Sequence, residues 1–156
     1  MTIHLHFNRR VPLLRDEDIW LHVAPGVTEA HFPQLFEFAW SELPEDARQA
    51  ILRQWRALLR EKPDRWLVGL TDQLDQRPET REYGMCEQDT GRMFFQASAM
   101  LGLDPPVAIC IIVHELAHAF LLASGSPDAG NEEVVDRLAH SWGFPMAGIR
   151  RKLAGM

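Results

Sequence analysis

The sequence has 156 residues, a formal net charge of −6 at pH 7, 46% hydrophobic and 24% charged residues. This composition argues against disorder, and the length predicts a single domain over residues 1–156 that can bury a core without a metal or a disulfide. The acidic balance argues against a broad phosphate-binding surface, so we expect no nucleic-acid partner.

The two cysteines and the apolar segments bear on location. Cys110 lies in a strongly apolar run and is expected to be a buried free thiol, which together with Cys86 predicts no structural disulfide. The N-terminus has no basic segment leading into an apolar one, so we expect a cytoplasmic protein. The longest apolar run, residues 107–123, is interrupted by polar residues near its middle, which predicts a buried helix and no membrane partner.

The first half of the chain shows one alternating segment and two helical ones. Residues 3–7 alternate apolar side chains with His4 and His6, which predicts a strand with one wet face; we favour exposed histidines over a metal pair there. The spacing over residues 32–40 and 44–61 is helical. These two helices are interpreted as packing elements, with their aromatic residues in the core.

Strands are expected next. Residues 65–71 have the composition of a strand, and residues 83–87 and 92–96 predict two strands joined by a turn over residues 88–91. Gly91 can adopt the positive φ that such a turn uses. Helices, then a small, mostly antiparallel sheet, then further helices make an α+β fold.

The most apolar helix carries the residues of chemical interest. It is expected to begin at Asp104, because prolines follow, and to end at Gly125. His114 and His118 are four residues apart, so their imidazoles share a face and can bind one ion, with Glu115 beside it. This is the H-E-x-x-H arrangement, in which two neutral nitrogens hold the metal and a carboxylate takes a proton from its bound water.

The alternative is a purely structural helix, with hydrogen-bonded core histidines and Glu115 paired with an arginine. Two histidines and a glutamate in the middle of the most apolar helix argue against it, because such groups are rarely buried unless they are paired or ligating.

A catalytic zinc site needs a third protein ligand. Fourteen residues after His118, Glu132 and Asp136 lie four apart at the start of the next helical pattern. Glu132 can reach the metal, and Asp136 can accept the outer N–H of a ligating histidine. Glu133 is a competing third ligand, because one residue of helix phase is not settled by spacing. Alternatively, these acids merely favour a helix N-terminus.

His114-Glu115-Leu116-Ala117-His118, followed by Asn131-Glu132 and Asp136, resembles the motifs of gluzincin-type zinc metallopeptidases, thermolysin among them. The short loop between the motifs and the glycine-containing hairpin resemble the minimal zincins, which include the ImmA/IrrE-type peptidases. The resemblance covers residues 83–143 and implies a zincin-like core there; residues 1–80 have no assigned role. The extension typical of three-histidine metzincins is missing.

The resemblance implies one Zn²⁺ held by His114, His118 and Glu132, with Glu115 as general base and Asp136 as the partner of His114. It also implies a peptidase that cleaves a peptide bond by Glu-assisted attack of zinc-bound water on a peptide or protein substrate. Manganese, iron or cobalt can occupy the same ligands.

Tyr83 and His140 are candidates for stabilising the oxyanion, although both can equally be structural. The alternative function is a non-catalytic, metal-stabilised binding or regulatory module. Glu115 discriminates against it, because a purely structural zinc site does not use a carboxylate at that position.

Overall fold

The computed structural model describes residues 5–79 and 81–145. The strands in this part of the chain are β1 (Arg9–Leu14), β2 (Ile19–Val23), β3 (Val68–Thr71), β4 (Gly84–Cys86) and β5 (Met93–Gln96). The helices are α1 (Phe32–Ser41), α2 (Glu45–Glu61), α3 (Ala97–Met100), α4 (Pro105–Ala123) and α5 (Glu132–Ser141), with a 3-10 turn η1 (Arg15–Glu17). The expected α+β class is confirmed.

The five strands form one sheet in the order β1-β2-β3-β5-β4. The prediction of a mostly antiparallel sheet is wrong, because β2 pairs parallel with β3 and β3 pairs parallel with β5, while the two outer pairings are antiparallel. The parallel pairing of β2 and β3 arises because α1 and α2 carry the chain back between these strands. The sheet also joins strands from the first 80 residues to the hairpin of β4 and β5.

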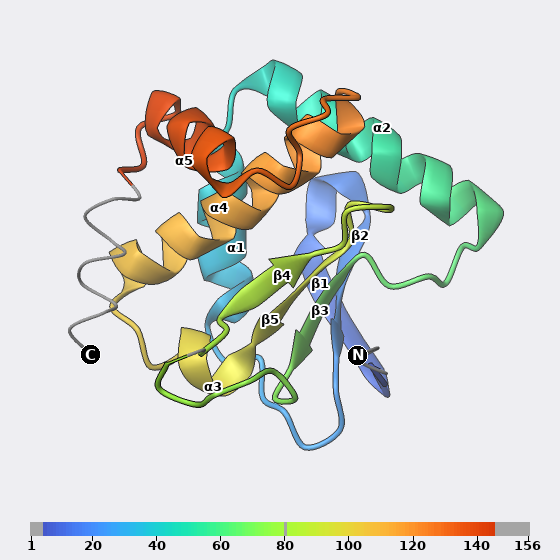
Figure 1. The fold of residues 1–156 in the computed structure, drawn as a ribbon. Helices are drawn as coiled ribbons and strands as arrows, with labels where there is room; N and C mark the ends of the chain where they lie inside the picture. The colour runs from blue at the N-terminus through green and yellow to red at the C-terminus, as the bar shows by residue number, and fades with distance from the viewer. Residues whose placement is uncertain (1–4, 80, 146–156) are drawn as a thin grey trace.

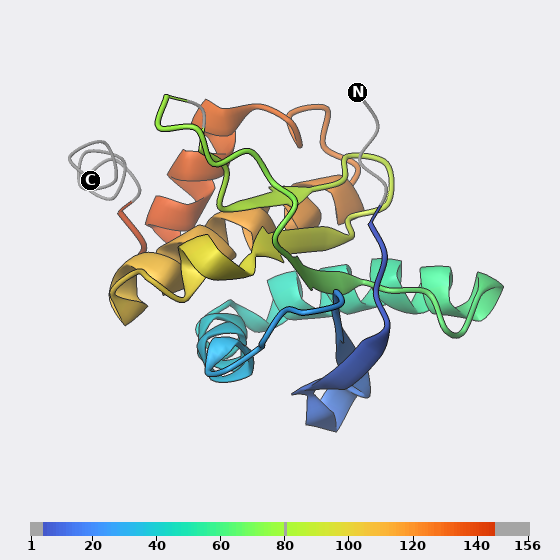
Figure 2. The ribbon, with the colours of Figure 1, turned by 90° about the horizontal axis from the view of Figure 1, so that it is seen from below.

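The N-terminal strand expected over residues 3–7 is not found: Leu5 to Phe7 form no strand, and residues 3 and 4 lie outside the described residues. Phe7 instead packs across the sheet, where a Cβ on Gly69 of β3 would come within 2.4 Å of its ring. Figure 2 shows the N-terminal segment passing in front of the chain where it leads into β3. The partly buried ring of Phe7 therefore contacts the sheet, although its segment forms no strand.

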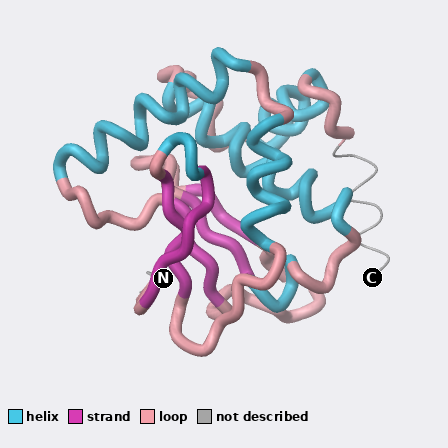
Figure 3. Tube along the Cα trace, turned by 180° about the vertical axis from the view of Figure 1, so that it is seen from behind, coloured by secondary structure: helices cyan, strands magenta, loops and turns pink. Residues whose placement is uncertain are grey.

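Helices α1, α2, α4 and α5 lie on one side of the sheet, and α4 contacts the other three (Figures 1 and 3). The predicted core aromatics are confirmed: Phe36, Trp40 and Trp55 are buried, and the two indoles stack with ring centroids 5.9 Å apart. The predicted helices agree with α1 and α2 to within a residue. Both α1 and α2 pack against α4.

The β4–β5 hairpin was predicted well. Gly91 has a φ of +78°, as its turn requires, and Trp55 Nε1 donates a 3.0 Å hydrogen bond to the Gly91 carbonyl. The turn is thereby tied to α2. Strand β4 of the hairpin packs against α4, the helix that carries the H-E-x-x-H segment.

Helix α4 is the central element. By length and composition it is the one helix in the described residues that is apolar enough to span a membrane, but 67% of its apolar window is buried inside the protein. Core helices meet the same criterion. The predicted burial and free thiol state of Cys110 are confirmed, and the helix ends at Ala123, with Ser124 as its C-cap before Gly125, whose φ is +74°.

Candidate metal centre

The H-E-x-x-H segment lies in the buried middle of α4. His114, Glu115 and His118 are 8%, 6% and 4% exposed. The two imidazoles lie one helical turn apart, with ring centroids separated by 4.8 Å and ring planes at 82°. These three side chains form a candidate metal-binding group, since each offers a ligand atom and these atoms lie within 4.8 Å of one another.

The loop after α4 fixes the orientation of His118. Its Nδ1 lies 2.6 Å from the carbonyl oxygen of Ala129. Because a carbonyl only accepts hydrogen bonds, Nδ1 carries the proton in this contact, and the lone pair of a neutral ring remains on Nε2. The backbone of Ala129 therefore selects the tautomer that binds a metal through Nε2.

The N-cap of α5 places the acidic residues. Asn131 Oδ1 accepts hydrogen bonds from the N–H groups of Glu133 (3.1 Å) and Val134 (3.3 Å), so the helix begins at Glu132. Val135 and Ala139 are fully buried on the apolar side of α5, which packs against α4. This packing directs the first turn of α5 toward the histidines.

Glu132 bridges the two imidazoles. Its Oε2 lies 2.8 Å from His114 Nε2, and its Oε1 lies 3.1 Å from His118 Nε2. On the other side of the His114 ring, Nδ1 lies 3.1 Å from Asp136 Oδ1. His118 Nδ1 thus has a hydrogen-bond acceptor, His114 Nδ1 lies at ion-pair distance from a carboxylate, and both rings turn Nε2 toward Glu132.

This donor set fits a divalent cation. With the proton of His118 on Nδ1, its Nε2 lone pair faces the anionic carboxylate of Glu132. A cation held by Glu132 and by the Nε2 atoms of both histidines satisfies all three groups together. A tetrahedral zinc ion with bonds of about 2.0–2.1 Å holds neighbouring donor atoms roughly 3.3 Å apart. The separations of 2.8 and 3.1 Å are close to that spacing. The residues therefore fit the group that the sequence predicts.

Glu115 lies beside these donors. Its Oε1 is 4.0 Å from His114 Nε2, farther away than either oxygen of Glu132 is from its histidine. Burial raises the pKa of the Cys86 thiol on β4 well above its usual value, and the negative charges of Glu115 and then of Glu87 raise it further. Glu115 is thus a buried acid on α4, and its charge reaches the strand that packs against this helix.

The other predicted site residues lie outside this cluster. Glu133 and His140 are exposed on α5, and neither belongs to the His/Cys/Asp/Glu groups found in the described residues. Tyr83 is partly buried and lines a pocket with Arg81 and Ser98. Their predicted roles, ligand for Glu133 and oxyanion stabiliser for the other two, remain predictions.

Three features near the site had no sequence signal. The Ala129 carbonyl holds His118 through the main chain, which any residue supplies. The hairpin approaches the same loop, because a Cβ on Gly130 would lie 3.7 Å from Gln88 Oε1. The sequence assigns Cys86 no part in the site, and the structure puts it on β4, where the charge of Glu115 raises its pKa.

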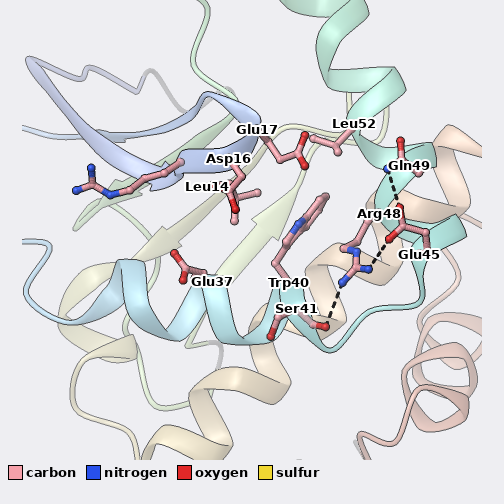
Figure 4. A pocket seen from close by; sticks show the side chains of 11 residues that line it. Leu14, Asp16, Glu17, Glu37, Trp40, Ser41, Glu45, Arg48, Gln49 and Leu52 are labelled. Atoms are coloured by element: carbon pink, nitrogen blue, oxygen red, sulfur yellow. Dashed lines mark hydrogen bonds and ion pairs between the residues drawn. The ribbon is translucent and has the colours of Figure 1, made fainter.

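A separate pocket of about 450 Å³ lies over α1, α2 and the β1–η1 corner (Figure 4). Trp40 projects into it, and Glu45 is held there by Arg48 and Gln49. None of the candidate metal-site residues lines this pocket. Its polar contacts tie α2 to the end of α1, where Arg48 donates to the Ser41 carbonyl.

Comparisons of the chain with protein-family models, with curated proteins and with solved structures found no match.

Proposed function

We propose that this protein is a zinc-dependent peptidase with a zincin-like site. One observation carries the proposal: the Nε2 atoms of two buried histidines on α4 meet the carboxylate of Glu132 on α5 at 2.8 and 3.1 Å. The Glu132 side chain is 60% exposed while both histidines are buried, so the site opens to solvent on the α5 side. Three protein ligands with one side left open are typical of catalytic zinc sites.

Each residue of the site is assigned one chemical role in this proposal. A bound zinc ion supplies Lewis acidity for a carbonyl group and for water. Glu115, buried beside the donors, accepts the proton of the attacking water and delivers it to the leaving nitrogen. The Ala129 carbonyl accepts the Nδ1 proton of His118, and the Asp136 carboxylate, 3.1 Å from His114 Nδ1, is assigned the same role for His114, so that both rings stay in the ligating tautomer.

The position of β4 at the edge of the sheet favours a peptide as the substrate. β4 is an outer strand whose partner in the described residues is β5. The Tyr83 carbonyl accepts from Gln96 N–H at 2.9 Å, and Glu87 N–H donates to the Arg92 carbonyl at 2.8 Å. Because main-chain groups alternate in an antiparallel pair, those of Gly84 face the free edge. An extended peptide can pair there, next to α4.

The experiment compares zinc-loaded wild type with Glu115→Gln on a library of peptides blocked at both ends, with products identified by mass spectrometry. We expect cleavage by the wild type and at least about a hundredfold less by Glu115→Gln, with equal zinc content. Glu133→Gln, on the exposed side of α5, is the matched control and should cleave like the wild type.

Equal cleavage by wild type and Glu115→Gln would refute the assigned role of Glu115. Tight binding of one zinc ion without cleavage by any variant would instead favour the alternative of a metal-stabilised binding module.

A further inference from the structure

A second pocket, of about 290 Å³, lies where β4 and α4 both begin. We call it the Arg81 pocket. The described residues that line it are Gln76, Arg81, Tyr83, Ser98, Ala99, Gly102 and Leu103. They come from the loop before β4, from α3 and from the turn that leads into α4.

The chemistry of this pocket favours an anion. Arg81 is the one charged residue among its described lining residues, and Tyr83 adds a hydroxyl group. Ser98 Oγ accepts a 3.0 Å hydrogen bond from Gln96 Nε2, which leaves the hydroxyl proton of Ser98 as a donor. A guanidinium group with two hydroxyl donors matches a carboxylate, which accepts hydrogen bonds only.

The neighbouring acids Asp72 and Asp75 have partners of their own: Asp72 Oδ1 accepts a 2.9 Å hydrogen bond from the main-chain N–H of Ser98, and Asp75 pairs with Arg77. Asp75 receives two hydrogen bonds from Arg77 Nε and a third from Arg77 Nη2, at 2.7 to 3.1 Å. Gln76 Nε2 donates to the carbonyls of Asp75 and Glu82 at 2.8 and 2.7 Å, which closes the loop that carries Arg81. These contacts hold Asp75, Gln76 and Glu82 together, and the positive charge of Arg81 lies at the pocket.

The pocket lies in line with the candidate metal centre. From it, β4 and α4 run side by side in the same direction (Figure 1): β4 packs against α4, the charge of Glu115 acts on Cys86, and farther along a Cβ on Gly91 would lie 3.6 Å from Leu122. Tyr83 and Cys86 are three residues apart, about 10 Å along an extended strand. A peptide paired with β4 would thus place a residue about three positions from the scissile bond at the pocket.

We propose that the Arg81 pocket binds a carboxylate group of the peptide substrate, from an acidic side chain or from the C-terminus. This inference rests on the proposed peptidase function. It gives the site a preference for substrates with a negative charge about three residues from the bond that is cleaved.

Binding is tested first, without cleavage. Glu115→Gln is titrated with N-acetylglutamate N-methylamide, N-acetylglutamine N-methylamide and N-acetylalanine, while amide signals of Ser98 and Gly102 are followed by NMR. The first probe carries a side-chain carboxylate and the third a terminal one. We expect one of them to bind at least about tenfold more tightly than the glutamine probe, because a charge-assisted hydrogen bond is about twice as strong as a neutral one.

Arg81→Ala should abolish this preference. Arg77→Ala is the matched control, because Arg77 lies in the same loop, is exposed and pairs with Asp75 outside the pocket. Equal binding of all three probes, or a preference that survives Arg81→Ala, would overturn the carboxylate assignment.

Cleavage then tests the link to the metal centre. Zinc-loaded wild type is given peptides that differ by Glu, Gln or Lys at one position, moved residue by residue from the cleaved bond. We expect Glu to be favoured about tenfold in kcat/KM at one position near the third residue, and Arg81→Glu to favour Lys there instead. A C-terminal preference would appear as faster cleavage of peptides with a free carboxylate at that distance.

The two proposals fail differently. If the wild type cleaves and Glu115→Gln does not, but no position prefers a negative charge, the Arg81 inference is wrong and the peptidase function stands. If the wild type cleaves nothing, both the function and the substrate role of the pocket are wrong, whatever the probes show.

Discussion

Glu132 Oε2 lies 2.8 Å from His114 Nε2, although the two residues belong to different helices and differ greatly in exposure: 60% of the Glu132 side chain is exposed and 11% of that of His114. The contact joins α5 to the buried middle of α4. A group that is buried on its histidine side and open on its acidic side can hold an ion and still admit a substrate.

The two adjacent glutamates of α5 should behave differently. Glu132→Ala removes the carboxylate that bridges both histidines and should lower zinc affinity by about 100-fold or more, beyond the 10–100-fold typical for loss of an outer partner. Glu133→Ala should leave the affinity within about twofold. Competition with a chelating dye measures both. The opposite ranking would assign the ligand role to Glu133.

Asp136 is expected to act through His114. Asp136→Asn keeps an acceptor oxygen but loses the negative charge that holds the Nδ1 proton, and should weaken zinc binding by about 10–100-fold while one ion still binds. Asp128→Asn, in the exposed loop before α5, serves as the control and should bind zinc like the wild type. Unchanged affinity in Asp136→Asn would show that the 3.1 Å contact does not support the ligand.

The Cys86 thiol should react slowly with iodoacetamide. Burial and the charge of Glu115 raise its pKa, so at pH 8 it is a thiol, and the reactive thiolate appears only as the pH rises further. In metal-free protein, Glu115→Gln removes one cause and should speed alkylation roughly two- to tenfold, because one pKa unit alters the thiolate fraction about tenfold. Mass spectrometry of the Cys86 peptide gives the rates.

Glu115→Asp is the control for this prediction, because it keeps the charge and should react like the wild type. Equal rates in all three proteins would contradict an effect of the Glu115 charge on Cys86.

The N-cap of α5 should contribute to stability and to the site. Asn131→Ala removes the acceptor of two main-chain N–H groups and should lower the free energy of unfolding by about 1 kcal/mol. Asn131→Asp retains an acceptor and should restore most of the loss. Urea unfolding measures these differences. If both variants were as stable as the wild type, the cap would not be what fixes the start of α5.

The elements that were predicted well carry local signals. The prolines after Asp104 and the glycine at position 125 delimit α4, and Gly91 marks the turn of the hairpin. Each of these residues restricts or frees its own backbone dihedral angles, so its effect does not depend on the rest of the fold.

The strands that were missed depend on distant partners. β1 contains Arg9, Arg10 and Pro12, a composition that does not indicate a strand. It forms as an outer strand, where proline is tolerated, because β2 offers an antiparallel partner. The parallel pairing of β2 with β3 joins segments some 45 residues apart, a contact that no local pattern encodes.

The candidate site likewise has one part that local spacing predicts and another that depends on distant contacts. The proximity of His114 and His118 follows from helical spacing, and the structure has them one turn apart. The approach of Glu132 depends on the course of residues 124–131 and on the packing of Val135 against α4, which the spacing of motifs does not specify. The carbonyl of Ala129 carries no side-chain signal at all.

Calorimetric titration of zinc into metal-free protein tests the central claim most directly. We predict one tightly bound ion per chain in the wild type and in Glu115→Gln, and none in the double variant His114→Ala/His118→Ala, with His140→Ala, an exposed histidine of α5, binding like the wild type. The claim is contradicted if the wild type takes up no ion at saturating zinc, or if the double variant binds it equally well.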